Sequence, residues 1–340
     1  FLIISNEEFV GHLSKQKINS IELDYKYNNL FNYLSFEKIC KIQNSKIDLD
    51  KFISKKTTVE FNNICLAHKE DGISLTKFIL KIKQNMKLYS NEYSFIDELY
   101  NLRKEGINFF RNSFDYISAL DENGAIVHYK PTLKSSKKFN QQNILLLDSG
   151  GHYLEGTTDV TRVIKLNNSK NAQIKKYYTY LLKSLIKLEN TTFNSDSTGS
   201  DLDNFIRKYL LKFGISYGHG TGHGVGYFND VHEKYPIISP SFNKRLFHNN
   251  LFSIEPGYYK PGSYGLRIEN LYFSKIHKGK LKLHNVTLVP YELDLIDWLL
   301  ITQQEKSHIK KYHYSIFNNF KTRLNELEKK DFLKLLINKL

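Results

Sequence analysis

The sequence predicts an α+β fold in which amphipathic helices cover short, apolar strands. Residues 171–189 and 199–213 repeat apolar side chains at the spacing of one helix face. Residues 144–148 and 251–255 are short apolar runs that each end in a carboxylate. A run that is apolar at both alternating positions indicates a strand buried on both faces. Helices packed on buried strands are therefore the expected architecture.

Composition agrees with a globular domain and excludes some partners. The chain has 340 residues, 41% hydrophobic and 25% charged, which suffices for one large domain and an appendage. The net charge is +14, but the Lys and Arg residues are scattered, so we expect a solvated basic surface and no nucleic-acid partner. No apolar run approaches the ~20 residues that cross a bilayer, so we expect no membrane association. Cys40 and Cys65 form no disulfide framework, which predicts a cytoplasmic protein.

Residues 1–53 read as half of a small α/β domain. Helical patterns at 6–16 and 30–36 flank a strand at 19–23, and one strand has too few partners to be stable alone. The chain begins at Phe1 and not at a methionine, so we expect a fragment or a processed product. This part is predicted to be a partial, non-catalytic domain.

Two further helical patterns precede the strands. The first begins at Thr57, is interrupted at Gly72 and resumes over 73–82. The second follows Ser94, and we expect Ser94 to be its N-terminal cap, with Asp97 three residues later. These helices should cover a sheet, and no chemical motif is visible on them. A short apolar run at 124–131 then carries His128 and is predicted to be a strand that Pro131 ends. Alone, such a histidine is typical of a core or a turn.

Residues 217–227 hold two histidines four apart among glycines. The glycines argue against a helix and favour an extended segment, in which His219, Thr221 and His223 project to one side. Glycines between them would let a ligand or another backbone come close. The segment could be a glycine-rich loop with incidental histidines, or a two-histidine metal clamp. His232 follows in a loop.

Four carboxylates in or at the ends of predicted strands favour a metal site over a loop with incidental histidines. Asp148 ends one strand, Asp159 lies in a predicted strand at 156–162, Glu255 ends a third, and Glu269 shares a strand face with Arg267. Turn hydrogen bonds or a simple ion pair with Arg267 would explain some of them separately. Converging in one site, they would repel each other unless cations lay between them. Two divalent metals solve that problem, and oxygen ligands with one imidazole suit Mn²⁺ best, with Co²⁺, Zn²⁺ or Fe²⁺ as alternatives.

Five motifs in order resemble the aminopeptidase P branch of the pita-bread metallopeptidases, over roughly residues 54–315. They are Leu-Asp-Ser-Gly-Gly, Gly-Thr-Thr-Asp-Val-Thr-Arg, His-Gly-Thr-Gly-His-Gly-Val-Gly, Glu-Pro-Gly-Tyr-Tyr and Gly-Leu-Arg-Ile-Glu-Asn. The resemblance implies a pita-bread (creatinase/aminopeptidase) domain at 54–290. It also implies that Asp148 and Asp159 bind one metal, that Asp159 and Glu269 bridge the pair, and that His223 and Glu255 complete the other.

By the same resemblance, His128, His219 and His232 handle substrate and Arg267 supports the ligands. A water or hydroxide bridging the metals would attack the scissile carbonyl, while His219 and His232 could donate hydrogen bonds to its oxygen. Glu255 is the candidate for passing a proton to the leaving nitrogen. The family implies release of the N-terminal residue from peptides whose second residue is proline.

The chain departs from long family members at its N-terminus. Those members carry two further N-terminal domains, and residues 1–53 resemble only the latter part of the second. After 290, a basic helical extension at 291–340 follows, and we expect it to dock on the domain or to face a second copy in a homodimer. Its apolar stripe consists of Leu324, Leu327, Leu335 and Leu336.

Three other functions compete with this one. A proline dipeptidase or another pita-bread hydrolase would use the same ligands on different substrates. A non-catalytic pita-bread binding module should have lost metal ligands, and all five are present in the sequence.

Overall fold

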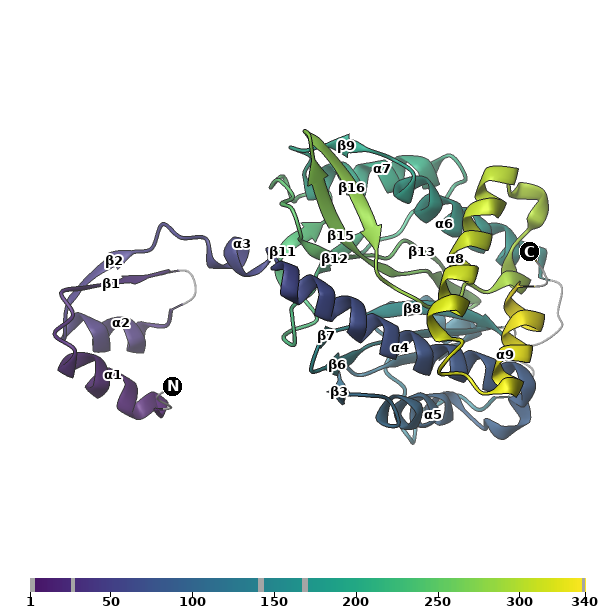
Figure 1. The fold of residues 1–340 in the computed structure, drawn as a ribbon, viewed down its shortest axis with the longest axis horizontal. Coiled ribbons are helices and arrows are strands. Elements are labelled where there is room, and N and C mark those ends of the chain that lie inside the picture. The colour runs from purple at the N-terminus through teal and green to yellow at the C-terminus, as the bar shows by residue number, and fades with distance from the viewer. Residues whose placement is uncertain (1–3, 26–27, 140–143, 167–170, 338–339) are drawn as a thin grey trace. The chain divides into compact units, whose positions relative to one another are not determined.

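The structure is a computed structural model that describes residues 4–25, 28–139, 144–166, 171–337 and 340. Its contacts divide the chain into two compact units, Phe1–Ile53 and Ser54–Leu340 (Figure 1). Within the described residues, no helix is long and apolar enough to cross a membrane.

The first unit is a small α/β segment. Its two strands pair in parallel, with Ser20 opposite Lys41, and Ser5 begins the first helix with a capping box. The predicted order of helix, strand and helix is observed, and a second strand follows. The elements are α1 (Asn6–Lys15), β1 (Ser20–Leu23), α2 (Leu30–Glu37), β2 (Lys41–Asn44) and α3 (Leu49–Ile53).

The second unit places helices outside several small sheets. Its helices are α4 (Thr58–Gln84), α5 (Glu92–Lys104), α6 (Ala172–Glu189), α7 (Gly199–Leu211), α8 (Gln303–Phe320) and α9 (Glu326–Phe332). Short helical turns are η1 (Met86–Leu88), η2 (Asp121–Ala125), η3 (Leu293–Leu295), η4 (Trp298–Leu300) and η5 (Leu333–Ile337).

The sheets are mostly antiparallel, and the largest among the described residues runs in the order β11-β10-β12-β15-β16-β9. Two three-stranded sheets, β4-β5-β8 and β3-β6-β7, and the hairpin β13-β14 complete the set. The strands are β3 (Phe109–Asn112), β4 (Ile117–Leu120), β5 (Ile144–Ser149), β6 (Gly151–Tyr153), β7 (Gly156–Thr157), β8 (Val160–Lys165), β9 (Phe193–Asn194), β10 (Gly222–Gly224), β11 (Glu233–Ile238), β12 (Leu251–Ile254), β13 (Gly257–Lys260), β14 (Tyr264–Arg267), β15 (Asn270–His277) and β16 (Lys280–Asn285).

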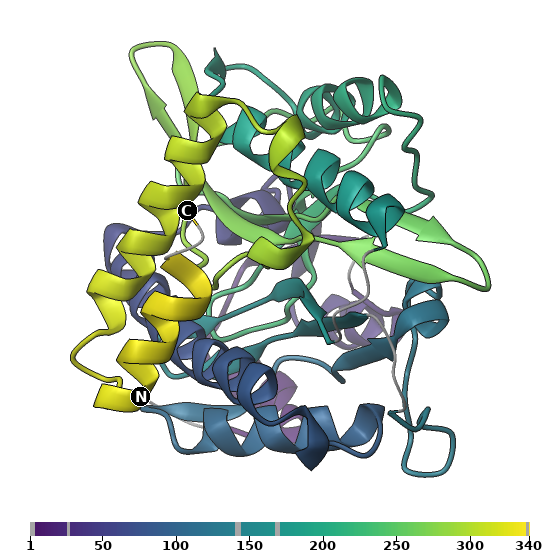
Figure 2. The ribbon, with the colours of Figure 1, turned by 90° about the vertical axis from the view of Figure 1, so that its right-hand side faces the viewer.

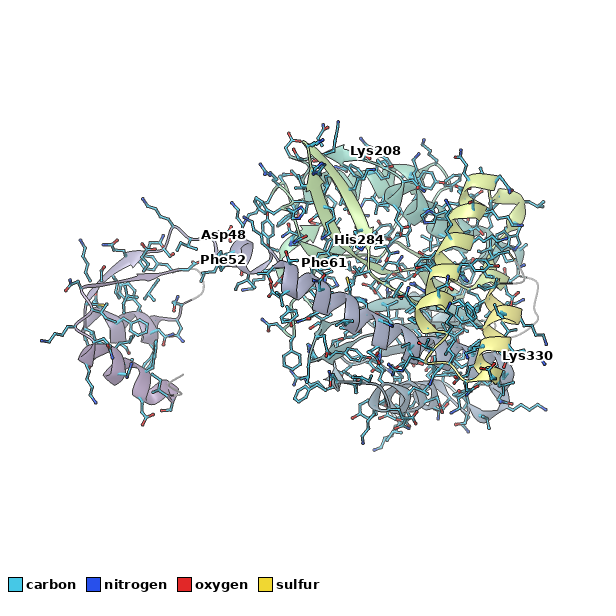
Figure 3. The ribbon with its side chains drawn as sticks, viewed as in Figure 1. Asp48, Phe52, Phe61, Lys208, His284 and Lys330 are labelled. Carbon is cyan, nitrogen blue, oxygen red and sulfur yellow. The ribbon has the colours of Figure 1, made fainter. Side chains whose placement is uncertain are left out.

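The two largest apolar clusters among the described residues pack helices against strands. The apolar faces of α6 and α7 pack with residues of β12, β14, β15 and β16, and those of α4 and α5 pack with β5 and β8. Figure 2 shows the strands lying between these two groups of helices. Phe61 of α4 reaches His284 of β16, with 5.8 Å between ring centroids (Figure 3). The predicted α+β architecture is therefore confirmed.

Glycine at position 72 does not interrupt the helix, contrary to the sequence-based prediction. α4 runs unbroken past it, and a Cβ added there would lie 2.2 Å from the carbonyl oxygen of Leu288. Gly72 therefore permits a close approach of two backbone segments. The predicted cap of α5 is also wrong, because Asn91 caps the helix and Ser94 closes the capping box from inside.

The predicted strand at 124–131 is absent. Residues 121–125 form the turn η2, and a further turn closes where the amide of Tyr129 donates to the carbonyl of Ile126. Gly124 lies so close to the hairpin β13-β14 that a Cβ on Gly265 would be 1.7 Å from its carbonyl oxygen. The segment packs against this hairpin as turns. A strand here would need a neighbouring strand to form hydrogen bonds with its backbone.

The C-terminal helices pack against α4 within the second unit. Leu324 and Leu336 are buried with residues of α4 and α8 in one apolar cluster, as predicted. Leu327 is 63% exposed, so its place in the apolar stripe is wrong. Lys330 is exposed on α9 (Figure 3).

Candidate metal and active site

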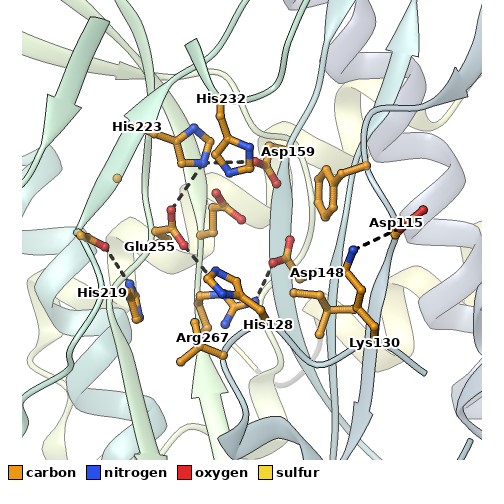
Figure 4. A pocket seen from close by; sticks show the side chains of 16 residues that line it. Asp115, His128, Lys130, Asp148, Asp159, His219, His223, His232, Glu255 and Arg267 are labelled. Atoms are coloured by element: carbon orange, nitrogen blue, oxygen red, sulfur yellow. Dashed lines mark hydrogen bonds and ion pairs between the residues drawn. The ribbon is translucent and has the colours of Figure 1, made fainter. Parts of the chain in front are cut away.

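All nine predicted site residues line one cavity of about 470 Å³ (Figure 4). Strands of three sheets and the residues next to them deliver seven of the nine, whereas His128 and His219 lie in a turn and a bend. The lining residues are Phe114, Asp115, Ile117, Val127, His128, Lys130, Asp148, Asp159, His219, Gly220, Gly222, His223, His232, Glu255, Arg267 and Glu269.

The four carboxylates come from neighbouring strands. Asp148 lies in β5 opposite Thr161 of β8, and Asp159 immediately precedes β8. The prediction that Asp159 lies within a strand is thus wrong by one residue, because β7 and β8 are separate. Glu255 directly follows β12, and Glu269 lies between β14 and β15.

His223 presents a lone pair to two carboxylates. Its Nδ1 lies 2.9 Å from the carbonyl oxygen of Gly224, and a carbonyl can only accept, so Nδ1 carries the proton. In the neutral ring, Nε2 is then an acceptor, and it faces Asp159 Oδ2 and Glu255 Oε1, each at 3.5 Å. Acceptors facing one another repel unless a cation or a proton lies between them. This arrangement fits a cation bound at Nε2.

Three of the predicted ligands form a tight group. Asp159, His223 and Glu269 each offer one ligand atom within 4.8 Å of the others. Asp148 and Glu255 border this group, and Oδ1 of both Asp148 and Asp159 is buried without a hydrogen-bond partner among the described residues. Buried carboxylate oxygens without donors are expected where a cation binds.

Burial and mutual repulsion raise the pKa values of these carboxyls. Burial raises the pKa of Asp159 well above its ordinary value, and the negative charges of Glu269 and Asp148 raise it further. The pKa of Glu269 is raised well above its ordinary value by burial and by Glu255, and burial raises the pKa of Glu255 to about 7. Without cations the cluster would therefore hold protons at neutral pH.

Arg267 is buried beside the cluster and orients it. Its Nη2 donates to Asp148 Oδ2 at 2.6 Å, and its Nε donates to Thr161 Oγ1 at 3.1 Å. Thr161 in turn donates to Glu269 Oε2 at 2.8 Å. Arg267 thus pairs with Asp148, and the simple ion pair between Arg267 and Glu269 considered from the sequence is not what the structure contains.

His219 differs from His223 in its hydrogen bonds. Its Nδ1 donates to the carbonyl of Gly220 at 2.7 Å, and burial lowers its pKa to about 4, so the ring is neutral with Nε2 as acceptor. The hydroxyl of Tyr259 donates to this Nε2 at 2.9 Å and accepts from Arg267 Nη1 at 3.1 Å. In this state His219 does not offer Nε2 as a donor to substrate. Sequence reasoning missed Tyr259, although it lies in the quoted Glu-Pro-Gly-Tyr-Tyr motif.

Thr221 points away from the cavity, so the expectation of three side chains on one side fails for it. Its hydroxyl donates to Asp203 of α7 at 2.6 Å. Arg207, paired with Asp203, donates to the backbone carbonyls of Tyr217 and His219 at 2.8 and 2.6 Å. Helix α7 therefore holds the glycine-rich segment in place, which its apolar stripe alone could not reveal.

The remaining two histidines lie at other walls of the cavity. The ring of His232 is 4.2 Å from that of His223, measured between centroids, and burial with the nearby His223 lowers its pKa. His128 lies near Arg267 and Asp148 in Figure 4 and is exposed. The structure thus brings all three substrate-handling candidates to the cavity.

Glycine at position 222 sets the place of His223. A Cβ added to Gly222 would lie 1.8 Å from the carbonyl oxygen of Ser253, whose hydroxyl accepts from the amide of His223. We expect Gly222→Ala to separate β10 from β12, to destabilise the fold by about 1–3 kcal/mol and to weaken metal binding. Urea unfolding and metal analysis measure both effects.

Gly218→Ala is the matched control, because a Cβ there meets no atom within 4 Å. Equal losses in both variants would show that the segment tolerates no side chain anywhere, and the close approach at Gly222 would not be the cause.

The fold around this cavity is the pita-bread fold expected from the motifs. The chain belongs to metallopeptidase family M24, whose model matches residues 63–274. A model of the C-terminal region of the same family matches residues 279–339.

Relatives and solved structures agree with this family. A putative Xaa-Pro aminopeptidase FRA1 of Saccharomyces cerevisiae is 37% identical over 287 residues, which cover 81% of this chain and 38% of that protein. A probable Xaa-Pro aminopeptidase P of Sordaria macrospora is 38% identical over 79% of this chain and 46% of that protein. The chain thus spans less than half the length of these two relatives.

Among solved structures, an X-prolyl aminopeptidase of Caenorhabditis elegans is 30% identical with a TM-score of 0.77. The match covers 88% of this chain and 50% of that one, which is described as a cytosolic enzyme with a di-nuclear active site. A prolidase of Pyrococcus furiosus matches 84% of this chain and 80% of its own with a TM-score of 0.65 and 21% identity. At that identity the likeness concerns the fold alone, so the fold does not separate aminopeptidase from dipeptidase.

Proposed function

We propose that this chain carries the catalytic part of a dinuclear-metal aminopeptidase that hydrolyses the N-terminal Xaa-Pro peptide bond. The observation that carries the proposal is the Nε2 lone pair of His223 facing Asp159 and Glu255 across 3.5 Å. Membership of family M24 and the names of the relatives support the reaction class. In this proposal residues 54–290 are the catalytic domain, 1–53 a partial non-catalytic domain and 291–340 a C-terminal extension.

Five residues would hold the two cations, and the chemistry of the donors suits them. The ligands are Asp148, Asp159, His223, Glu255 and Glu269. Four carboxylates and one imidazole favour Mn²⁺, with Co²⁺, Zn²⁺ or Fe²⁺ as alternatives. When bound, the cations would supply an activated water as nucleophile and would polarise the scissile carbonyl.

The chain's own side chains orient the ligands and move protons. Arg267 fixes one oxygen of Asp148, and the Nδ1–H bond to Gly224 fixes the tautomer of His223. Glu255, whose Oε1 lies 3.5 Å from His223 Nε2 in the cavity, is our candidate for carrying a proton on its carboxyl oxygen to the leaving proline nitrogen. Protonation of that nitrogen is needed because the proline amide leaves as an amine.

The three other histidines would contact substrate. His128 and His232 line the cavity, where their ring nitrogens would form hydrogen bonds to the peptide. His219 would donate only after its Nε2 gains a proton, because that nitrogen accepts from Tyr259 in the neutral ring. The direct donor role first proposed for His219 is therefore replaced by a role within the chain from Arg267 through Tyr259.

The substrate assay separates the proposal from its nearest rival. We expect the full chain loaded with Mn²⁺ to release alanine from Ala-Pro-Ala, and a chelator to abolish the reaction. Ala-Ala-Ala, which lacks the second-position proline, should be cleaved far more slowly. Cleavage of Ala-Pro without cleavage of Ala-Pro-Ala would make the chain a proline dipeptidase. Metal binding without any hydrolysis would favour a non-catalytic binding module.

Three further assignments complete the proposal. We place the chain in the cytoplasm because its two cysteines are free, and we expect no nucleic-acid or membrane partner. We expect a homodimer. Light scattering of the purified chain would measure its mass, and a monomer at micromolar concentration would contradict this.

A further inference from the structure

Glu92 is a wholly buried carboxylate outside the metal cluster, at the first residue of α5. Four donors surround it. Oε1 accepts from the amide of Leu120 at 2.7 Å and from Asn123 Nδ2 at 2.9 Å. Oε2 accepts from the hydroxyl of Tyr129 at 2.7 Å and from the amide of Lys137 at 2.8 Å.

All four donors belong to one stretch of chain, residues 120–137, which we call the 120–137 segment. This segment leaves β4, forms η2 and continues through two further turns. Three of its residues, Val127, His128 and Lys130, line the cavity. Glu92 therefore ties together both ends and the middle of the segment that carries His128.

The tie acts close to His128 itself. The turn Ile126–Tyr129, which includes His128, closes with the amide of Tyr129 donating to the carbonyl of Ile126 at 3.0 Å. The Tyr129 hydroxyl that donates to Glu92 also accepts from Asn123 at 2.9 Å. The residue next to His128 is thus fixed at its backbone and at the tip of its side chain.

The buried carboxylate of Glu92 and the 120–137 segment stabilise each other. A buried carboxylate is costly unless hydrogen bonds compensate it, and among the described residues no lysine, arginine or histidine forms an ion pair with Glu92. The four donors of the 120–137 segment supply the compensation. Conversely, residues 121–137 contain no strand, and the only ladder contact at this end among the described residues is the bridge between Asn91 and Lys138, so the bonds to Glu92 hold the part of the segment before it.

We propose that Glu92 is a positioning residue, which holds the 120–137 segment so that His128 faces the metal cluster and the bound peptide. The inference rests on the proposed function for the role of His128, but the tie between Glu92 and the segment can be tested without activity. Glu92 touches neither substrate nor metal ligand and acts only through the segment.

Glu92→Gln tests the tie directly. A carboxamide keeps the shape of the side chain, but its NH₂ group would face two donors where an oxygen now accepts. Bonds to a charged acceptor are worth enough that amide exchange in the 120–137 segment should speed up about tenfold or more. Hydrogen exchange read by mass spectrometry measures this, and bound metal should be unchanged. No increase, or an equal increase throughout residues 54–340, would overturn the proposal.

Glu98→Gln is the matched control, because it makes the same change on the same helix at a carboxylate that pairs with Lys81. Exchange in the 120–137 segment should then stay at the wild-type rate. Should Glu92→Gln fail to fold, Tyr129→Phe removes one of the four donors and keeps the carboxylate. A smaller increase confined to the same segment is expected, and no increase would overturn the proposal.

A double-mutant cycle tests whether Glu92 acts through His128. With Ala-Pro-Ala as substrate, Glu92→Gln should lower kcat/KM in the wild type and should cost little more in a His128→Ala background. Additive losses would overturn the positioning role. A wild-type chain that binds metal but cleaves no Xaa-Pro peptide would refute the proposed function, and the exchange experiment would still decide whether Glu92 holds the segment.

Discussion

Asp159→Asn should abolish metal binding and hydrolysis while leaving the metal-free fold more stable. Asp159 Oδ2 lies 3.5 Å from His223 Nε2, and its other oxygen has no partner among the described residues. Loss of a ligand oxygen should cost more than the roughly 10- to 100-fold that loss of a ligand's own hydrogen-bond partner costs in metal affinity. Metal analysis and the Ala-Pro-Ala assay measure the two losses.

The gain in stability has a definite dependence on pH. Because the folded pKa of Asp159 is raised, the folded state binds the proton more tightly than the unfolded state does. That stabilising contribution is complete below the unfolded pKa and is lost as pH rises through the folded pKa. With EDTA present, the free energy of unfolding of Asp159→Asn should therefore rise relative to that of the wild type between pH 5.5 and pH 8. The expected increase in this difference is on the order of 2 kcal/mol.

Urea unfolding at the two pH values, each with EDTA, gives this comparison. An advantage that shrinks as pH rises would mean that Asp159 is already compensated in the metal-free protein. The repulsion on which the two-metal assignment depends would then be absent.

Replacing each histidine of the glycine-rich segment should give different results. His223→Ala removes the Nε2 acceptor that faces two carboxylates, so we expect loss of bound metal and of activity. His219→Ala removes an acceptor that is already occupied by Tyr259, so metal should remain. Because His219 acts through Tyr259, turnover should fall by less than the roughly 10²- to 10³-fold loss expected for a residue that donates directly in the transition state.

Metal content and kcat, measured on both variants, decide between these roles. Equal loss of metal from the two would restore the two-histidine clamp that the spacing first suggested. The contrast depends on the tautomers, because both rings donate from Nδ1 to a backbone carbonyl and differ only in what Nε2 faces.

Strand ends were the most predictable part of the site. Each of Asp148, Glu255 and Glu269 follows or ends an apolar run, and an ionised group at the end of a buried strand needs a partner. That reasoning needs only local sequence, and the structure brings all three to the cavity. The resemblance of the motifs added which of the two metals each of these residues should bind.

Local sequence was less informative where distant segments decide the structure. Gly72 looks like a helix breaker until the carbonyl of Leu288, far along the chain, is seen to press against it. The apolar run around His128 looks like a strand, but Glu92 and the hairpin β13-β14 hold it as turns. Both are tertiary effects that override local propensity.

The residues that sequence reasoning missed act on backbone atoms or on other side chains. Arg207 donates to two carbonyls of the glycine-rich segment, and Glu92 accepts from two amides. Such roles leave no periodic pattern and no motif of metal-binding residues. Tyr259 was the one with a usable signal, because it follows Glu255 by four residues in a quoted motif.

The most direct test of the two-metal site is the metal content of the purified chain. After treatment with a chelator and reloading with Mn²⁺, elemental analysis should find two ions bound per chain. Asp159→Asn, prepared in parallel, should retain neither. Hydrolysis of Ala-Pro-Ala should appear only in the reloaded wild type. Undiminished hydrolysis by chain freed of metal, or no bound metal after reloading, would contradict the account.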